Sequence, residues 1–256
     1  MKFIGIIPAR YASTRFPAKP LAMLGGRTVI ERVYRNVENE VDDIVVATDD
    51  VRIAQAVEAF GGNVVMTRTD HRSGTDRCFE AYVKTMADET ASADTVVINI
   101  QGDEPFIHPQ QIAAIRQCFA DSTTDIATLV KPFTPADGFA ALQNPNTPKV
   151  VVNGRDEAMY FSRSVIPYLR GVEAGDEWLS KHTYYKHIGL YAYRAKVLAE
   201  ITQLPPSALE LAESLEQLRW LQNGYRIKVG YTDIETIGID TPADLQRAEA
   251  FLAASC

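Results

Sequence analysis

Short runs of β-branched and other apolar residues alternate with amphipathic segments along the first half of the chain. The expected strands cover 2–7, 44–48, 64–67, 95–100 and 126–130. The segments between them repeat apolar residues at i, i+3 and i+4, which predicts helices over 28–36, 51–60, 75–87 and 109–120. This alternation is typical of an α/β protein with a mostly parallel, doubly wound sheet that carries helices on both faces.

The pattern changes after Val130, where prolines, aromatic residues and polar residues mix as far as Tyr193. Strand-like pieces remain at 149–153, 158–161 and 187–193. A helix over about 209–221, a strand over 226–231 and a final helix that opens near Asp240 follow them. We interpret 131–224 as a smaller second lobe and expect 225–256 to return to the first lobe, which begins with 1–130.

Composition and charge restrict the class of protein. The chain has 256 residues, is 46% hydrophobic and has a net charge of −7. An acidic chain argues against general binding to nucleic acid or membrane surfaces, because such binders are usually basic. No apolar run approaches the ~20 residues that span a bilayer, and the N-terminal run is too short for a signal peptide. The three cysteines are widely spaced and form no metal-ligand pair. We therefore expect a cytoplasmic protein.

Cations gather in the loop that follows the first expected strand. Arg10, Arg15 and Lys19 lie there beside the hydroxyl of Ser13, and no acidic residue precedes Glu31. A loop between a strand and a helix can direct backbone N–H groups and cations toward phosphates, and arginine binds phosphate through two hydrogen bonds. No GxxxxGK[ST] motif is present, so the loop is not a P-loop. It predicts a polyanionic ligand, and the alternative is a solvated basic loop.

Two aspartates are candidates for a metal site. Asp103 follows the strand expected at 95–100, in the sequence QGDEP. Mg²⁺ needs few protein carboxylates when a nucleotide supplies other oxygens, although glycine, aspartate and proline are also ordinary turn formers. Asp240, in GIDTP, either supplies a second carboxylate or caps the final helix, for which Thr241 is the other candidate cap. The residues alone leave these alternatives open.

Two further groups of polar residues are candidates for ligand contacts, and each has a structural alternative. Ser73, Gly74 and Arg77 lie at the start of the helix expected at 75–87, where such residues either contact a base or ribose or cap the helix. The second lobe offers Arg163, His187, Tyr191, Glu216 and Gln217. A single histidine or tyrosine on a strand is more often structural, and Glu216 with Arg219 has the spacing of a surface ion pair.

Eight short motifs follow one another in an order that resembles the 3-deoxy-manno-octulosonate (Kdo) cytidylyltransferase family. They are PARYxSTRxPxKPL, ATDD, SGTxR, QGDEP, YFSR, HxGxYxYR, LEQLR and GIDTPxDL. The resemblance extends from residue 4 to about residue 252. The first and last motifs also occur in looser form in other sugar nucleotidyltransferases, whereas QGDEP, YFSR and LEQLR point to the Kdo enzymes. No hydrolase, zinc protease or dinucleotide-binding motif stands out.

The resemblance implies an Mg²⁺-dependent enzyme of the nucleotide-diphospho-sugar transferase fold, usually a homodimer formed through the second lobe. It implies that CTP and Kdo become CMP-Kdo and pyrophosphate, which activates the sugar for lipopolysaccharide synthesis. Lys19, Asp103 and Asp240 would be catalytic, and the two aspartates would bind the metal. The implied CTP contacts are Arg10, Ser13, Arg15, Lys19, Ser73, Gly74, Arg77 and Gln101. The implied sugar contacts are Arg163, His187, Tyr191, Glu216 and Gln217.

The chain departs from the family pattern at two positions. Ala18 stands where the family usually has glycine, and Asp76 stands where it usually has glutamate. Alanine adopts a positive φ less readily than glycine, so the backbone just before Lys19 should be less free than in the family. The sequence leaves two alternatives to the Kdo cytidylyltransferase function. One is a CMP-sialic acid type of synthetase acting on another 2-keto acid sugar, and the other is a non-catalytic nucleotide-sensing module.

Overall fold

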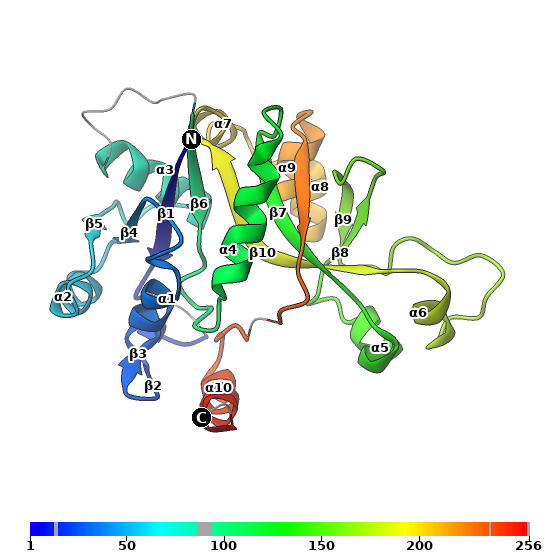
Figure 1. Ribbon diagram of the computed structural model, residues 1–256, viewed down its shortest axis with the longest axis horizontal. Coiled ribbons are helices and arrows are strands. Elements are labelled where there is room, and N and C mark those ends of the chain that lie inside the picture. Colours follow the sequence, from blue (N-terminus) through cyan, green and yellow to red (C-terminus); the bar gives the residue numbers. More distant parts are fainter. Residues whose placement is uncertain (13–14, 86–93, 236, 255–256) are drawn as a thin grey trace. The chain divides into compact units, whose positions relative to one another are not determined.

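The computed structural model describes residues 1–12, 15–85, 94–235 and 237–254 (Figure 1). The chain forms two compact units. The first comprises Met1–Ala113, Ala192–Thr202 and Glu235–Cys256, and the second comprises Ala114–Tyr191 and Gln203–Ile234. These bounds differ from those of the predicted lobes, because β7 (Ile126–Pro132) and β11 (Ile227–Tyr231) both belong to the second unit. The two strands pair in parallel.

A parallel sheet of order β6-β1-β4-β5 forms the centre of the first unit. Its strands are β1 (Lys2–Ala9), β4 (Asp43–Thr48), β5 (Val64–Met66) and β6 (Thr95–Asn99). Every residue of β6 is buried, including the polar Thr95 and Asn99, as are five consecutive residues of β1, which explains why both strands are mostly apolar. Because the strands run parallel, their carboxyl ends meet at one edge. The predicted α/β class with a mostly parallel sheet is confirmed.

Helices pack on this sheet, and the apolar periodicity predicted the first three of them but not the fourth. They are α1 (Val29–Val37), α2 (Val51–Ala59), α3 (Gly74–Thr85) and α7 (Ala195–Ile201). Thr28 and Asp50 cap α1 and α2 by accepting hydrogen bonds from backbone N–H groups in the first turn. Helix α3 packs against β1, β4 and β6, and α7 packs against β6.

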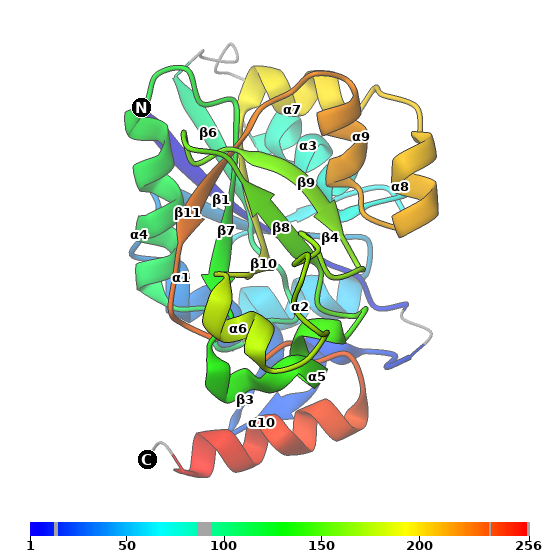
Figure 2. The ribbon, with the colours of Figure 1, turned by 90° about the vertical axis from the view of Figure 1, so that its right-hand side faces the viewer.

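The C-terminal helix α10 (Pro242–Ala254) packs against the hairpin of β2 (Met23–Leu24) and β3 (Arg27–Thr28), as Figures 1 and 2 show. The buried side chains of this contact are Leu24, Val29, Ile239 and Ala248. Burial of each of the three larger side chains stabilises the fold by roughly 1.5–3 kcal/mol. The contact therefore places residues 237–242 beside the N-terminal loop within the first unit.

The second unit contains the other strands and several short helices. The strands are β7, β8 (Lys149–Val152), β9 (Ala158–Ser162), β11 and most of β10 (Tyr185–Arg194). Strand β8 pairs antiparallel with β9 and β10. An aromatic and aliphatic core forms between the short elements around Phe133, Trp178 and Tyr184. The short helical elements of this unit include α5 (Gly138–Gln143), α6 (Glu177–Lys181) and the 3-10 turns η2 (Cys118–Ala120) and η3 (Pro135–Asp137). Helix α4 (Pro109–Gln117) contains the boundary between the two units, and the 3-10 turn η1 (Lys19–Leu21) belongs to the first unit.

The prediction of a single helix over 209–221 is wrong. The structure has two helices there, α8 (Ala208–Glu213) and α9 (Gln217–Gln222), which Figure 2 shows separately. Ser214 ends α8 in a left-handed conformation with φ of 51°. The carboxylate of Glu213 accepts hydrogen bonds from Ser162 Oγ and the backbone N–H of Arg163. Contacts with a distant strand thus override the local apolar spacing.

In the described part of the chain, none of the helices combines the length and apolar character that crossing a bilayer requires.

Candidate active site

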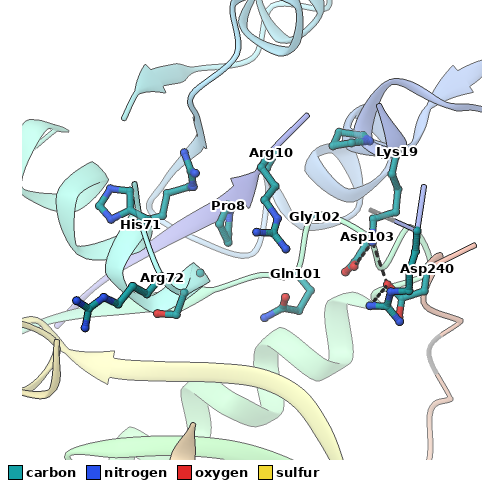
Figure 3. A pocket seen from close by; sticks show the side chains of 15 residues that line it. Pro8, Arg10, Lys19, His71, Arg72, Gln101, Gly102, Asp103 and Asp240 are labelled. Atoms are coloured by element: carbon teal, nitrogen blue, oxygen red, sulfur yellow. Dashed lines mark hydrogen bonds and ion pairs between the residues drawn. The ribbon is translucent and has the colours of Figure 1, made fainter. Parts of the chain in front are cut away.

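A cavity of about 250 Å³ lies at the carboxyl edge of the sheet in the first unit (Figure 3). Its lining residues are Pro8, Ala9, Arg10, Arg15, Lys19, Pro20, His71, Arg72, Ser73, Gly74, Arg77, Gln101, Gly102, Asp103 and Asp240. In Figure 3, His71 and Arg72 lie toward one end, Lys19, Asp103 and Asp240 lie toward the other, and Arg10 and Gln101 lie between them. The cavity thus unites nearly all the residues predicted to bind CTP. Ser13 lies outside the described residues.

Gly102 allows two loops to meet at this edge. The backbone N–H of Ile100 donates to Ile6 O over 2.9 Å, which extends the pairing of β1 and β6 beyond the end of β6. A Cβ atom at Gly102 would lie only 2.8 Å from the carbonyl oxygen of Pro8. Only glycine permits so close a backbone approach. The sequence QGDEP therefore needs its glycine in order to bring Asp103 to the N-terminal loop.

A backbone hydrogen bond places the two aspartates side by side. The buried Ile239 donates its N–H to Asp103 O over 2.9 Å. Thr241, not Asp240, caps α10, because Thr241 Oγ1 accepts a hydrogen bond from the N–H of Asp244. The Asp244 carboxylate accepts in return from the backbone N–H groups of Asp240 and Thr241. The capping alternative for the Asp240 side chain is thereby excluded, and its carboxylate lines the cavity.

The cations of the N-terminal loop bind these carboxylates directly. Lys19 Nζ lies 2.6 Å from Asp103 Oδ2 and 3.2 Å from Asp240 Oδ1. Both terminal nitrogens of Arg15 lie 3.2 Å from the oxygens of Asp240. The Lys19 side chain is 13% exposed and that of Arg15 is 66% exposed, so the lysine contacts are the less screened of the two. Two carboxylates and two cations thus meet at one end of the cavity.

Ala18 precedes this ion-pair cluster in a left-handed conformation, with φ of 58° and ψ of 18°. Its N–H donates to Tyr11 O over 3.0 Å, and its carbonyl accepts from the N–H of Leu21 over 2.8 Å. These two bonds close the loop and aim Lys19 at the aspartates. The family glycine has a physical reason here, because the position requires a positive φ.

Replacing Ala18 with glycine should therefore stabilise the protein. The left-handed conformation costs a residue with a Cβ about 1–2 kcal/mol, and the greater freedom of glycine in the unfolded chain offsets part of that. We expect Ala18→Gly to raise the free energy of unfolding by about 0.5–1 kcal/mol in urea titrations. Ala22, with φ of −60°, provides the control: Ala22→Gly should lower stability. Equal losses in both variants would contradict the strain at Ala18.

Ser73 and Arg77 are held by the protein itself. Ser73 Oγ accepts from the N–H of Asp76 over 3.1 Å, so it caps α3 as the structural alternative proposed. The buried guanidinium of Arg77 donates to Thr67 Oγ1 over 2.5 Å and to Asp49 Oδ2 over 2.8 Å. Both residues still line the cavity. Asp49, which sequence reasoning did not single out, fixes the arginine from a neighbouring strand end.

A second network that the sequence did not reveal centres on Glu80 of α3. Its carboxylate accepts from the backbone N–H of Arg68 over 3.2 Å and from Lys84 Nζ, and it pairs with His71 Nε2. Burial raises the pKa of Glu80, but the hydrogen bonds from Lys84, Arg68 and His71 outweigh it and lower the pKa from 4.5 to about 2. The network anchors the 68–72 segment, and with it the cavity wall at His71.

Glu80 should make stability depend on pH. Its folded-state pKa lies below its unfolded value of 4.5, so its contribution is fully present above pH 4.5 and is lost as pH falls toward 2. We expect Glu80→Gln to lower the free energy of unfolding by roughly 2–3 kcal/mol at pH 7. The deficit should shrink between pH 4.5 and 2 in denaturant titrations. Glu38→Gln, at an i, i+3 surface pair with Arg35, is the control and should cost well under 1 kcal/mol. A deficit at Glu80 that does not vary with pH would contradict the network.

The predicted sugar contacts all lie in the second unit. His187 is enclosed by Phe161 and Tyr191, each with a ring centroid 5.2 Å away, and its Nε2 lies 3.1 Å from Thr128 Oγ1. Burial lowers the pKa of His187 to about 3, so its imidazole is neutral at pH 7. Burial, with the nearby charge of Glu216, raises the pKa of Tyr191 well above its ordinary value. These side chains form one cluster.

The other predicted sugar contacts differ in the hydrogen-bond partners that they have within the protein. Glu216 accepts a hydrogen bond from Arg219 over 2.6 Å, in the i, i+3 pair considered as the alternative. The Gln217 side chain is buried, and among the described residues its Nε2 finds no hydrogen-bond acceptor. The guanidinium of Arg163 donates to backbone carbonyls of Pro145, Glu213 and Ser214. Arg163 therefore stabilises the end of α8 in this state.

Comparisons with known proteins agree with the motifs. A family model described as cytidylyltransferase matches residues 4–229. A protein of Parabacteroides distasonis named 3-deoxy-manno-octulosonate cytidylyltransferase is 67% identical over 99% of both chains. One of the same name from Porphyromonas gingivalis is 55% identical over 97% of this chain and 96% of its own. A solved structure of CMP:2-keto-3-deoxy-manno-octonic acid synthetase complexed with CTP matches all of both chains at 42% identity, with a TM-score of 0.87. The chain therefore belongs to the 3-deoxy-manno-octulosonate cytidylyltransferases, a family of nucleotidyltransferase enzymes.

Proposed function

We propose that this enzyme transfers the cytidylyl group of CTP to the anomeric hydroxyl of Kdo, forming CMP-Kdo and pyrophosphate. The observation that carries the proposal is the meeting of loop cations and two carboxylates in one cavity. Such a cavity suits a triphosphate and its metal ion. The high identity to relatives named for this activity supports the choice of both substrates. A sialic acid as the sugar is not favoured by these relatives.

Asp103 and Asp240 fit the implied Mg²⁺ site. Their carboxylates approach a common point, and carboxylate oxygens are the ligands that Mg²⁺ prefers. Among the described residues no cluster of three or more acidic, histidine or cysteine side chains is available for a metal. Phosphate oxygens and water would therefore complete the coordination. When bound, Mg²⁺ would neutralise phosphate charge and polarise the oxygens of the reacting phosphate.

The side chains of the cavity would act by positioning and by charge. The sugar hydroxyl oxygen attacks the α-phosphorus, the bond from that phosphorus to the β-phosphate oxygen breaks, and the hydroxyl proton passes to solvent. Arg10 and Arg15 would bind the phosphates, and Lys19 would neutralise the charge that develops on pyrophosphate. The N-terminus of α3, at Gly74, adds its positive dipole end. Holding two anionic substrates in line supplies much of the acceleration.

The second unit would bind the sugar. The Gln217 amide, buried without an acceptor among the described residues, suits a sugar oxygen. The neutral His187 and the neutral phenol of Tyr191 would bind further hydroxyls. Arg163 would pair with the sugar carboxylate after it releases the carbonyls of Pro145 and Ser214. We also propose that the enzyme is a cytoplasmic homodimer that pairs through this unit.

A pyrophosphate-release assay tests the function. The purified chain is supplied with CTP and either Kdo, a sialic acid or another 2-keto acid, with and without Mg²⁺. We expect release only with Kdo and only with the metal. Pyrophosphate release with a sialic acid but not with Kdo would assign the enzyme to the CMP-sialic acid type of synthetase. Calorimetric binding of Mg·CTP without release in any mixture would instead support a nucleotide-sensing module.

A further inference from the structure

We infer that Lys19 and Arg15 are internal counter-ions that occupy the metal-binding carboxylates until CTP draws them away, so that metal and nucleotide bind cooperatively. The inference rests on the proposed Mg²⁺ site. It assigns the two cations a function before the nucleotide arrives, in addition to their proposed contacts with phosphate.

Most of the carboxylate oxygens of the proposed metal site are already paired with cations. Asp240 Oδ1 lies 3.2 Å from both Lys19 Nζ and an Arg15 nitrogen, and Asp240 Oδ2 lies 3.2 Å from the other Arg15 nitrogen. Asp103 Oδ2 lies 2.6 Å from Lys19 Nζ. Both oxygens of Asp240 and one of Asp103 are therefore paired with cations of the same loop.

A metal ion and the Lys19 ammonium compete for this position. Mg²⁺ binds carboxylate oxygens at about 2.1 Å, so on the Asp103 oxygen it would lie within about 5 Å of Nζ, where cations repel strongly. The repulsion is poorly screened, because the Lys19 side chain is only 13% exposed. Arg15, which is 66% exposed, should compete less.

The triphosphate removes the competition. Its oxygens accept charge-assisted hydrogen bonds from lysine and arginine, so bound CTP offers Lys19 and Arg15 other anionic partners. Both aspartates then become available to the metal. If CTP raises the affinity for metal, the metal must raise the affinity for CTP by the same factor. Lys19 is in this respect a positioning residue that acts through Asp103 and Asp240.

Manganese binding without turnover tests the inference. Mn²⁺ is titrated into the full-length protein without sugar, and the free ion is measured by electron paramagnetic resonance. We expect Lys19→Met, which keeps the aliphatic stem, to bind Mn²⁺ alone at least about fivefold more tightly than wild type. Arg15→Met should shift in the same direction by less. Arg15 is largely exposed, so this second variant retains the fold even if Lys19→Met does not.

Arg10→Met is the matched control. Arg10 lines the same cavity, and among the described residues it forms no ion pair with either aspartate. Its loss should leave the affinity for Mn²⁺ alone within about twofold, because Arg10 occupies neither carboxylate and solvent in the open cavity screens its charge. Its affinity for CTP should fall. An Arg10→Met gain equal to that of Lys19→Met would overturn the inference, since general charge would then explain both.

The ternary complex of protein, Mn²⁺ and CTP is detected by the relaxation rate of water protons. The rate must exceed that of Mn·CTP without protein. In wild type, CTP should raise the affinity of the protein for Mn²⁺ at least about fivefold, and in Lys19→Met this factor should shrink. If wild type forms a ternary complex that Asp103→Asn loses, but neither Lys19→Met nor Arg15→Met binds Mn²⁺ alone more tightly, the inference fails and the metal site stands. If wild type forms no ternary complex, both the counter-ion inference and the proposed Mg²⁺ site are wrong.

Discussion

Asp103→Asn is expected to reduce CMP-Kdo formation by at least about 10³-fold in kcat while the protein stays folded. The substitution removes one negative charge and almost no volume. It leaves Lys19 paired with Asp240 at 3.2 Å, so the N-terminal loop keeps a tether. The amide is a poor ligand for Mg²⁺ compared with a carboxylate. Pyrophosphate release at saturating CTP and Kdo measures the loss, and thermal unfolding checks the fold.

Asp43→Asn is the control for this loss. Asp43 also pairs with a lysine, Lys2, at 3.0 Å in the first unit, but it starts β4 and does not line the cavity. Its variant should keep wild-type turnover. Near-normal turnover by Asp103→Asn would remove Asp103 from the metal site. An unfolding midpoint far below that of wild type would mean that Asp103 acts mainly through its bond to Lys19.

The first unit was largely predictable because its signals are local. Strands such as 2–7 and 95–100 consist mostly of apolar residues, and this is the pattern of a parallel strand that is buried on both faces. The parallel order then brings the loops after β1 and β6 to one edge. Arg10 and Gln101 could therefore be expected in the same site from sequence pattern and topology alone.

The parts that escaped prediction depend on contacts between distant residues. Whether Asp240 caps a helix or faces the cavity is decided by Thr241 and Asp244, which satisfy the cap themselves. The break in the helix predicted at 209–221 depends on hydrogen bonds from Ser162 and Arg163. No spacing rule encodes these partners, and the Glu80 network leaves no motif at all.

Gly102→Ala is expected to damage both stability and CTP binding, although it adds only one methyl group. The new Cβ would lie 2.8 Å from Pro8 O and 3.3 Å from an Ile7 methyl. The first contact is with backbone, which cannot rotate away as a side chain can. Overpacking of this kind costs about 1–3 kcal/mol, and we expect the upper part of that range in urea unfolding. Relief of the clash must move the loop that holds Asp103, so CTP affinity should fall at least about tenfold.

Gly74→Ala provides the matched control for stability, since Gly74 lines the same cavity. A Cβ there would meet its nearest neighbour, a Pro8 side-chain atom, at an ordinary 3.5 Å, so stability should change by well under 1 kcal/mol. The comparison separates close backbone approach from the general cost of adding a methyl group near the site. Equal stability of the two variants would mean that the loops after β1 and β6 can separate at little cost. A stable Gly102→Ala protein that has lost CTP affinity would instead show that the clash is relieved by moving Asp103 alone, with the sheet edge intact.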